Sequence, residues 1–373
     1  MSAALESVLD AETRLDVAAF ALAGRAPRAA FAPRDAEEVS ELLRACASDG
    51  WGVRIWGGGV HQVPMTPDAK YDVALSLARF DRVVDHEPGD LTCTLGAGLT
   101  LERAAAALAK HGQELPLESA QVARATVGGV CSVNASGARR VALGSPRDRV
   151  LGMRFVTGDG VIARAGGRVV KNVAGYGTHR MLCGSHGTLA VILEVSFKLL
   201  PSPARRVALL YALGAAPPSA EALRAVRMSR MEPAVLTVLG PGVPGGVGPG
   251  WTLVLGLEAD APWVAEQEEL AKGILGAPAR RMEQDEAFAL WRALADLDVT
   301  EGLSARAVVP SRVAETLAEL HATGAAGTFA HVESGGVRAK MTGQRDDGAG
   351  AEPALDPLRA RLQSAFGGQG VLA

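Results

Sequence analysis

The sequence predicts an α+β protein of two domains, and three features indicate this. Between residues 29 and 56 a strand, a helix and a second strand lead into a run of three glycines. From residue 189 to 199 every second residue is large and apolar, which is typical of a long, half-buried strand. Pro201 and Pro203 end this strand, and the glycine motifs do not recur beyond them. We therefore expect a lead-in at 1–25, a first domain at 26–203 and a smaller second domain at 204–373.

The first strand–helix–strand unit is defined by its boundaries. Residues 29–32 are apolar and end at a proline, as a short strand does. Asp35 followed by Glu38 matches a capping box, and apolar residues then recur at helical spacing as far as Gly50. The strand at 51–56 breaks directly into the glycine run, so that run lies at the end of a strand.

The remaining elements follow from similar patterns. Shorter strands are predicted at 73–77, 82–86 and 91–95, and Thr100 is placed to cap a second helix. Residues 150–164 form a predicted hairpin about a Gly-Asp-Gly turn. Beyond the two prolines, strands and helices alternate. These elements are the strands at 234–239 and 252–257 and the helices at 265–272 and 312–321.

Charge and composition exclude several classes of protein. The 38 Lys and Arg and 41 Asp and Glu are interspersed with no basic run, which excludes nucleic acid as a partner. No uncharged apolar run reaches the roughly 18 residues of a membrane span, so we expect no transmembrane segment. Acidic residues precede the short apolar stretch at 17–23, unlike a signal peptide. We expect a cytoplasmic protein that is able to attach peripherally to the inner membrane through partners.

The spacing of the cysteines bears on metal binding. Cys46, Cys93, Cys131 and Cys183 lie far apart in apolar runs. None belongs to a CxxC pair, so the chain lacks the ligand spacing of zinc or iron–sulfur sites. We expect buried free thiols, in keeping with a reducing compartment.

Three glycine-rich segments are candidates for binding a dinucleotide, at 57–59, 126–137 and 184–189. A diphosphate carries two negative charges, and glycines let backbone N–H groups approach it closely. The alternative for the first and third segments is an ordinary turn, and for the second a small-residue helix packed on a sheet. Asn134 and Ser136 favour binding in the second segment, because a helix that only packs does not need their polar groups.

Two familiar nucleotide fingerprints are absent. Gly96-Ala97-Gly98 begins like a Rossmann loop, but Leu101 stands where the third glycine is required. No GxxxxGK[ST] sequence occurs anywhere in the chain. The sequence therefore disfavours both an NAD-binding Rossmann domain and a P-loop ATPase.

Taken together, the segments resemble the FAD-binding domain of the vanillyl-alcohol-oxidase type, also called the PCMH type. Several motifs in the right order are more specific than any one of them, and the likeness is strong over 28–203 and loose beyond. Within this family the chain is similar to the FAD-binding E subunits of bacterial glycolate oxidase. The motifs lie at 128–137, 147–152, 169–176, 184–189 and 288–294.

The resemblance implies a two-lobed PCMH-type FAD-binding domain followed by a smaller, cap-like α+β domain. It also implies which residues contact the cofactor. These are Gly57, Gly58, Gly59, Val60 and His61 in the first pyrophosphate loop, Pro116, Leu117, Thr126, Val127, Gly128 and Gly129 along the flavin and diphosphate, Asn134, Ser136 and Gly137 continuing that site, and Gly187 and Val191 at the adenine or flavin edge.

Three departures from the family pattern affect these expectations. Some relatives attach FAD covalently through a histidine after the first glycine loop, but here that slot is Val60, so we expect non-covalent FAD. Metal-dependent relatives carry a histidine pair in the C-terminal domain, whereas this chain offers only His331, so we expect no catalytic metal. Relatives often have an acidic residue where this chain has Gly177, and the role of that acid is left open.

The sequence leaves the catalytic residues unassigned. Oxidation of a hydroxy acid needs a cation that holds the substrate carboxylate and an acceptor for the hydroxyl proton. For every candidate the alternative is a structural or surface role. The candidates are Lys171, Arg180 and Arg292 for the carboxylate, Tyr176 for the hydroxyl, and His179 and His186 for the base.

The resemblance implies an FAD-dependent oxidoreductase subunit that oxidises the CH–OH group of glycolate or a similar 2-hydroxy acid. Its implied partners are a second flavin-containing subunit and an iron–sulfur subunit, to which electrons pass. The sparse catalytic candidates keep a second hypothesis open, in which the chain is a non-catalytic electron-relay or structural module. A stand-alone FAD-linked alcohol oxidase is the third hypothesis.

Overall fold

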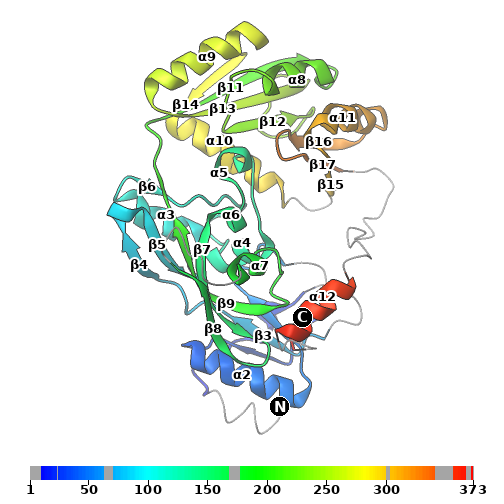
Figure 1. Ribbon diagram of the computed structural model, residues 1–373. Helices are drawn as coiled ribbons and strands as arrows, with labels where there is room; N and C mark the ends of the chain where they lie inside the picture. Colours follow the sequence, from blue (N-terminus) through cyan, green and yellow to red (C-terminus); the bar gives the residue numbers. More distant parts are fainter. Residues whose placement is uncertain are drawn as a thin grey trace.

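The computed structural model describes residues 10–22, 24–62, 70–167, 177–299, 303–340, 356–366 and 371–372, without the side chains of 356–360. It has the predicted α+β architecture, with one body formed by the N-terminal half and another built on a large sheet after residue 205 (Figure 1). The N-terminal body has two lobes, each with its own sheet.

The first lobe is a parallel three-stranded sheet in the order β1-β3-β2, joined by one long helix. Its elements are β1 (Ala29–Phe31), α2 (Ala36–Asp49), β2 (Val53–Trp56) and β3 (Val73–Ser76), preceded by the 3-10 helix η1 (Val17–Phe20).

The start of α2 confirms the predicted cap in part. The Asp35 carboxylate accepts a hydrogen bond from the Glu38 amide at 2.9 Å, as a capping residue does. The Glu38 carboxylate, however, accepts from the Arg34 amide at 2.7 Å, one residue before the partner that a capping box requires.

The second lobe is an antiparallel five-stranded sheet in the order β4-β5-β9-β7-β8, with the predicted long strand at its centre. Small helices cover it, and α4 lies against β9. The strands are β4 (Val83–Glu87), β5 (Thr92–Gly96), β7 (Val150–Thr157), β8 (Ile162–Gly166) and β9 (Ala190–Lys198), with a separate pair β6 (Gln113–Glu114) and β10 (Leu200–Pro201). The helices are η2 (Pro88–Asp90), α3 (Leu101–Ala109), α4 (Val127–Val133), α5 (Arg140–Leu143), α6 (Pro146–Arg149) and α7 (Thr178–Leu182).

The C-terminal body is an antiparallel seven-stranded sheet in the order β14-β11-β13-β12-β16-β17-β15. Its strands are β11 (Arg205–Gly214), β12 (Val235–Leu239), β13 (Trp251–Ala259), β14 (Arg280–Glu283), β15 (Ser304–Ala307), β16 (Ala326–His331) and β17 (Gly336–Lys340). Its helices are α8 (Ala220–Arg227), α9 (Ala261–Leu275), α10 (Gln284–Leu297), η3 (Pro310–Arg312) and α11 (Val313–Ala322).

Alternating side chains divide this sheet into two faces. In β11, Val207 and Leu209 pack in the cluster that includes α8, α9 and α11. Ala208 and Leu210 pack instead in the cluster of α10, which Ala138 of the N-terminal half also joins. The α10 face therefore meets the N-terminal half, as Figure 1 shows.

After the C-terminal body, the described residues 366, 371 and 372 contact the N-terminal half again. The Val53 amide donates to the Val371 carbonyl at 2.5 Å, and Leu372 forms a parallel bridge with Val53. The Phe366 carbonyl, directly after helix α12 (Asp356–Ala365), accepts a hydrogen bond from the Gly158 amide at 3.1 Å. Val371 and Leu372 are buried in the core of the N-terminal half.

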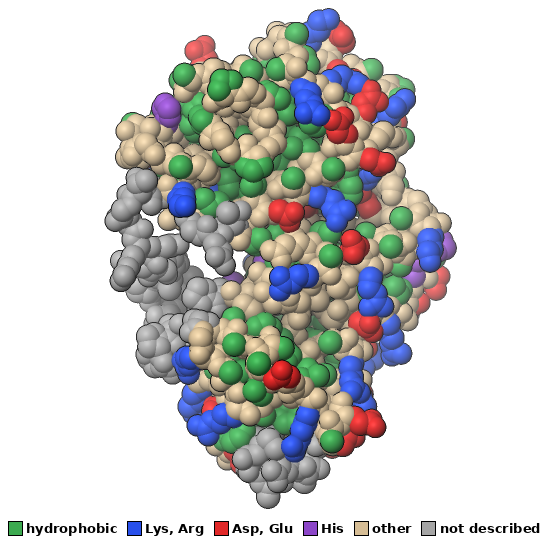
Figure 2. Space-filling view, turned by 180° about the vertical axis from the view of Figure 1, so that it is seen from behind, with side chains coloured by type: hydrophobic (Ala, Val, Ile, Leu, Met, Phe, Trp, Pro, Cys, Tyr) green, Lys and Arg blue, Asp and Glu red, His purple; other side chains and the backbone are tan. Residues whose placement is uncertain are grey.

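The four cysteines are buried and free, as predicted. Figure 2 shows one face of the molecule, on which basic and acidic side chains are interspersed. In the described part of the chain, no helix combines the length and apolar character needed to cross a membrane.

Candidate functional site

The three glycine-rich segments meet at one cavity, which we call the glycine cavity. Both lobes of the N-terminal half contribute to it, through β2 and β9. The other walls come from the loop after β2, the start of α4 and the loop that leads into β9. The lining residues are Arg54, Ile55, Gly57, Gly58, Gly59, Val60, His61, Gln62, Leu77, Ala125, Thr126, Gly128, Gly129, Ser132, Val133, His186, Gly187, Ala190 and Ile192.

Close backbone packing explains why glycines occupy these loops. A Cβ atom on Gly58 would lie 1.7 Å from the Arg124 carbonyl oxygen, and one on Gly57 would lie 2.2 Å from Thr126 Oγ1. Gly187 has a φ of +76°, which side-chain-bearing residues rarely adopt. The loop after β2 therefore lies directly on the segment before α4, with its backbone facing the cavity.

Hydrogen bonds distinguish the amides at the start of α4 from those of the loop after β2. At the start of α4, the Val127 amide donates to Leu99 O at 2.9 Å and the Gly128 amide to Ala97 O at 2.8 Å. The Gly129 amide donates to Thr126 Oγ1 at 3.3 Å. These three N–H groups are thus already satisfied within the protein. The amides of 57–59 donate to no other described residue in this way.

The charge of the glycine cavity fits an anionic group. Arg54, His61 and His186 line it, and among the described residues no carboxylate does. Burial lowers the pKa of the Arg54 guanidinium, although nearby Tyr71 acts in the opposite direction. A partly desolvated cation is stabilised when an anion comes beside it, so this wall suits a diphosphate.

A second cavity adjoins the first at the boundary between the two bodies, and we call it the interdomain cavity. It shares His61 and Val133 with the glycine cavity. Its remaining walls come from both bodies. These residues are Ser119, Ala120, Asn134, Ala135, Ser136, Gly137 and Arg140 of the N-terminal half and Ala295, Asp298, Val299 and Arg338 of the C-terminal body.

His61 lies at the junction of the two cavities. Its Nε2 atom is 2.7 Å from Ser119 Oγ, and Ser119 Oγ is 3.2 Å from the Ala120 carbonyl oxygen. Burial lowers the pKa of His61, the negative charge of Asp298 raises it in part, and His186 lowers it further. The net effect keeps the ring neutral at neutral pH.

Asp298 is held on the C-terminal wall by two basic side chains. His331 Nε2 is 3.3 Å from Asp298 Oδ2, and Arg338 Nε is 3.5 Å from Asp298 Oδ1. The other ring nitrogen of His331 is 2.9 Å from Thr237 Oγ1. His331 is thus buried, and both of its ring nitrogens lie beside side chains of the C-terminal body.

A buried carboxyl, Glu118, lies behind the interdomain cavity. It accepts a hydrogen bond from the Arg139 amide at 2.7 Å and would lie 2.6 Å from a Cβ on Gly137. Burial raises the pKa of Glu118 to about 7, against the opposing effect of the Arg139 charge.

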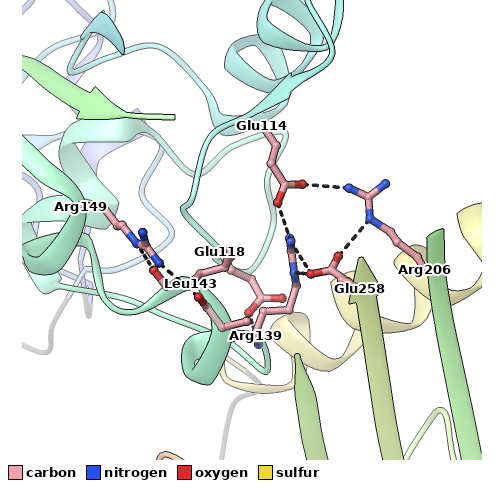
Figure 3. Close-up of polar contacts among 8 residues, drawn as sticks. Glu114, Glu118, Arg139, Leu143, Arg149, Arg206 and Glu258 are labelled. Atoms are coloured by element: carbon pink, nitrogen blue, oxygen red, sulfur yellow. Dashed lines mark hydrogen bonds and ion pairs between the residues drawn. The ribbon is translucent and has the colours of Figure 1, made fainter. Parts of the chain in front are cut away.

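Four charged residues join the two bodies, and we call them the interdomain charge cluster (Figure 3). They are the buried Arg139 and the half-buried Glu114, Arg206 and Glu258. Arg139 lies 2.8 Å from both Glu114 and Glu258, and Arg206 lies 2.8 Å from Glu114 and 3.0 Å from Glu258. The Arg206 guanidinium also stacks 4.8 Å above the Phe288 ring. Burial lowers the pKa of Arg139, but Glu258, Glu114 and Glu118 outweigh it and hold that pKa above its ordinary value.

The structure divides the predicted cofactor residues into three groups. The loop residues Gly57 to His61, with Thr126, Gly128, Gly129 and Gly187, line the glycine cavity. Asn134, Ser136 and Gly137 line the interdomain cavity instead, because Asn134 ends α4 in a left-handed conformation that turns the chain away. The other four are buried side chains that line neither cavity. They are Pro116, Leu117, Val127 and Val191.

Two of the candidates for holding the substrate carboxylate, Arg180 and Arg292, lie away from the two cavities. Lys171 and Tyr176 lie outside the described residues. Arg180 is exposed on α7, and Arg292 is exposed with Glu102 at 4.0 Å. Neither arginine lines a cavity.

The two candidate histidines differ in position. His179 has a buried Nδ1 without a hydrogen-bond partner among the described residues, and it lines neither cavity. His186 lines the glycine cavity.

Besides Gln62 and Ser132 of the glycine cavity, sequence reasoning missed five polar residues of the two cavities. Arg54 carried one signal, since a charged residue in a buried parallel strand is unusual. The others come from loops and ends of elements far apart in the sequence, which no local pattern connects. They are Ser119, Arg140, Asp298 and Arg338. Within the described ranges, no group of three or more His, Cys, Asp or Glu side chains is arranged to hold a metal ion.

Comparison with known proteins identifies the domain that contains the glycine cavity. Residues 27–166 match the family model described as an FAD binding domain. FAD is therefore the cofactor of this domain. The matched range includes β2, the loop after it and α4, which form most of the cavity wall.

Similar proteins of known name are flavoprotein subunits and dehydrogenases. Glycolate oxidase subunit GlcD of Bacillus subtilis is 28% identical over 57% of this chain and 45% of its own length. Subunit GlcE of Escherichia coli is 44% identical over 32% of this chain and 35% of its own length. D-lactate dehydrogenase of Archaeoglobus fulgidus is 35% identical over 47% of this chain and 40% of its own length. The match thus spans less than half the length of each of these relatives.

Solved structures show the same fold over nearly the whole chain. Alkyldihydroxyacetonephosphate synthase matches with a TM-score of 0.69 and 18% identity, covering 93% of this chain and 76% of that one. p-Cresol methylhydroxylase with substrate bound matches with a TM-score of 0.68 and 14% identity. The match covers 98% of this chain and 85% of that one. The predicted PCMH-type fold with a second α+β body is therefore confirmed.

Proposed function

We propose that this protein is an FAD-dependent oxidoreductase that oxidises the CH–OH group of a small 2-hydroxy acid, with FAD in the glycine cavity and the acid in the interdomain cavity. The observation that carries the proposal is the wall that the two cavities share at His61 and Val133. When bound, FAD supplies the acceptor for the two electrons and the hydrogen that leave the substrate carbon. The protein supplies charge, orientation and a proton acceptor.

The loop after β2 is the proposed holder of the diphosphate. Its amides at 57–59 are not engaged with other described residues, whereas those at the start of α4 are. Arg54 supplies a positive charge in the same wall. Thr126 and Gly129 border the flavin, and buried Pro116, Leu117, Val127 and Val191 act by shaping the walls behind it.

We expect the flavin to be bound without a covalent link. Val60, in the slot of the linking histidine, has no nucleophilic atom, and the ring of His61 is engaged by Ser119. Acid precipitation of the yellow protein should leave the colour in the supernatant. A yellow pellet would overturn this part of the proposal.

The substrate class is supported by the cationic side chains of the interdomain cavity. Arg140 and Arg338 line it from opposite bodies, and an arginine binds a carboxylate through two parallel hydrogen bonds. Ser136, which accepts from Arg140 at 2.9 Å, orients one of them. Glycolate, D-lactate and D-2-hydroxyglutarate appear in the names of the relatives, and all three are 2-hydroxy acids.

A role as one subunit of a complex is the second part of the proposal. Two of the relatives are named as subunits of glycolate oxidase, and this chain spans less than half of either. We expect electrons to pass to a second flavin-containing subunit and an iron–sulfur subunit, in a cytoplasmic complex that attaches peripherally to the inner membrane.

Anaerobic reduction of the bound flavin tests this function. The FAD-loaded chain is mixed with glycolate, D-lactate or D-2-hydroxyglutarate, and loss of the visible flavin absorbance is followed. Reduction in the isolated chain argues against a pure electron-relay module. Turnover with an artificial acceptor that requires the partner subunits argues against a stand-alone oxidase. If no 2-hydroxy acid reduces the flavin, with or without partners, the proposal is wrong.

A further inference from the structure

We propose that His61 is a catalytic residue, which takes the hydroxyl proton of the substrate on Nδ1 while Ser119 fixes its Nε2. The inference rests on the proposed function and assigns a base to it. His61 and Val133 are the two residues common to both cavities, and of these only His61 has a group that exchanges a proton.

The hydrogen bonds around Ser119 select the tautomer of His61. A serine hydroxyl has a single proton to donate. Ser119 Oγ lies 3.2 Å from the Ala120 carbonyl oxygen, which only accepts, and 2.7 Å from His61 Nε2. Both contacts are hydrogen bonds if Ser119 donates to Ala120 and His61 Nε2–H donates to Ser119. In this arrangement the lone pair that accepts a proton is on Nδ1.

The charges that face His61 come from several elements. Asp298, at the end of α10, raises the pKa of His61, while burial and His186 lower it. The other charged side chains of the two cavities are Arg54 on β2, Arg140 on α5 and Arg338 on β17, and Glu118 lies behind the wall. The neutral ring is ready to accept a proton, and the imidazolium that forms faces the carboxylate of Asp298.

The reaction balances with these groups. With FAD bound, the flavin would accept the hydrogen of the substrate C–H bond together with its bonding pair. The O–H bond breaks and its proton forms a bond to His61 Nδ1, so that the carbon–oxygen bond becomes a carbonyl. The product is a 2-oxo acid, and the proton on His61 passes to solvent through the interdomain cavity.

The variant His61→Gln tests the base directly in the FAD-loaded full chain, with partner subunits present if turnover requires them. The Gln amide can still donate to Ser119, but it has no basic nitrogen. We expect H61Q to bind FAD normally, to show the same change in flavin spectrum with glyoxylate, and to be reduced by glycolate about 10²–10⁴-fold more slowly. The matched control is His86→Gln, because His86 is hydrogen-bonded to Gln113 at 2.8 Å but lines neither cavity.

The pH profile separates a base from a structural histidine. In the wild type the rate of flavin reduction should fall as pH drops through the pKa of His61, and this acid limb should disappear in H61Q. In Glu118→Gln, Glu118 no longer titrates, and the acid limb should remain. This result would assign the limb to His61 and not to Glu118. An H61Q variant within threefold of the wild type, or one that loses FAD, would overturn the inference and leave the proposed function standing.

A second measurement does not depend on activity. Nitrogen-15 NMR of the histidine rings, with the His61 signal identified by its absence in H61Q, should show the Nε2–H tautomer at neutral pH. An Nδ1–H tautomer would contradict the proposed role of His61 even if every 2-hydroxy acid failed as a substrate.

Discussion

Gly58 is the residue at which one added methyl group would disturb the glycine cavity most. The Cβ of Gly58→Ala would lie 1.7 Å from a backbone oxygen, so the loop after β2 must shift. Overpacking of this kind costs about 1–3 kcal/mol, and we expect FAD affinity to fall at least about tenfold. Titration of the apoprotein with FAD measures this affinity. Gly273→Ala in α9 is the control, since its Cβ meets nothing within 4 Å. Equal FAD affinity in both variants would contradict the role of the loop.

Glu118 makes the stability of the protein depend on pH. Its pKa rises from 4.5 to about 7 in the folded state, so between these values the folded protein holds a proton that the unfolded chain has lost. Stability therefore falls as pH rises across this window and is level above it. Glu118→Gln should remove this fall and make the protein up to about 3 kcal/mol more stable than the wild type at pH 8.

Thermal unfolding at pH 5 and pH 8 measures this effect. Glu102→Gln is the control, because the Glu102 side chain is 58% exposed and should leave the pH dependence unchanged. A slope in E118Q that equals that of the wild type would show that Glu118 does not titrate in this range.

Some of the predicted cofactor residues lie together in one cavity, and these are residues whose own backbone determines their position. The glycines at 57–59 and 187 required only local geometry, and they line the expected cavity. Asn134 and Ser136 belong to the same predicted site but line the interdomain cavity, since a left-handed residue at the end of α4 redirects the chain. No sequence pattern pointed to Asp298, because its position in the cavity wall depends on contacts with His331 and Arg338, which are distant in the sequence.

At the scale of elements, the start of α4 links helix stability to the glycine cavity. Thr126 Oγ1 accepts from the Gly129 amide at 3.3 Å. Thr126→Val keeps the shape but removes this acceptor, so we expect a loss of about 1 kcal/mol in stability and weaker FAD binding. Ser219→Ala removes the corresponding cap of α8, whose Ser219 Oγ accepts from Ala222 at 3.1 Å. The S219A variant should lose a similar amount of stability and bind FAD as tightly as the wild type.

Thermal unfolding and FAD titration of these two variants distinguish the effects. If T126V and S219A bind FAD equally well, the cap of α4 matters for the helix alone.

The existence of most elements was predictable, but their order in the sheets was not. Alternation predicted β9, a capping aspartate predicted α2, and a Gly-Asp-Gly turn predicted the β7–β8 hairpin. Such patterns reflect which residues of one segment are buried. The position of β9 between β5 and β7 depends on pairing with strands far away in the sequence, which local patterns do not encode.

At the scale of the molecule, the interdomain charge cluster joins the N-terminal half to the C-terminal body. Glu258→Gln leaves the buried Arg139 and the half-buried Arg206 with one full carboxylate partner in the cluster, Glu114, which should cost about 3–5 kcal/mol. Urea unfolding should show this loss, and limited proteolysis should cut between the bodies sooner. Arg281→Met breaks surface ion pairs with Glu268 and Glu283 and should cost less than about 1 kcal/mol for each. Similar losses in both variants would mean that the cluster does not join the bodies.

The bridge between Val53 and Leu372 has a consequence for how the protein is made. Strand β2 emerges from the ribosome early, yet it gains this neighbour only after the 318 residues between Val53 and Leu372 have been translated. At about 5–20 residues per second, the first lobe waits on the order of tens of seconds with that edge unpaired. We therefore expect the nascent flavin domain to need chaperones, or its own second lobe, to protect the edge of β2 until Leu372 has been made.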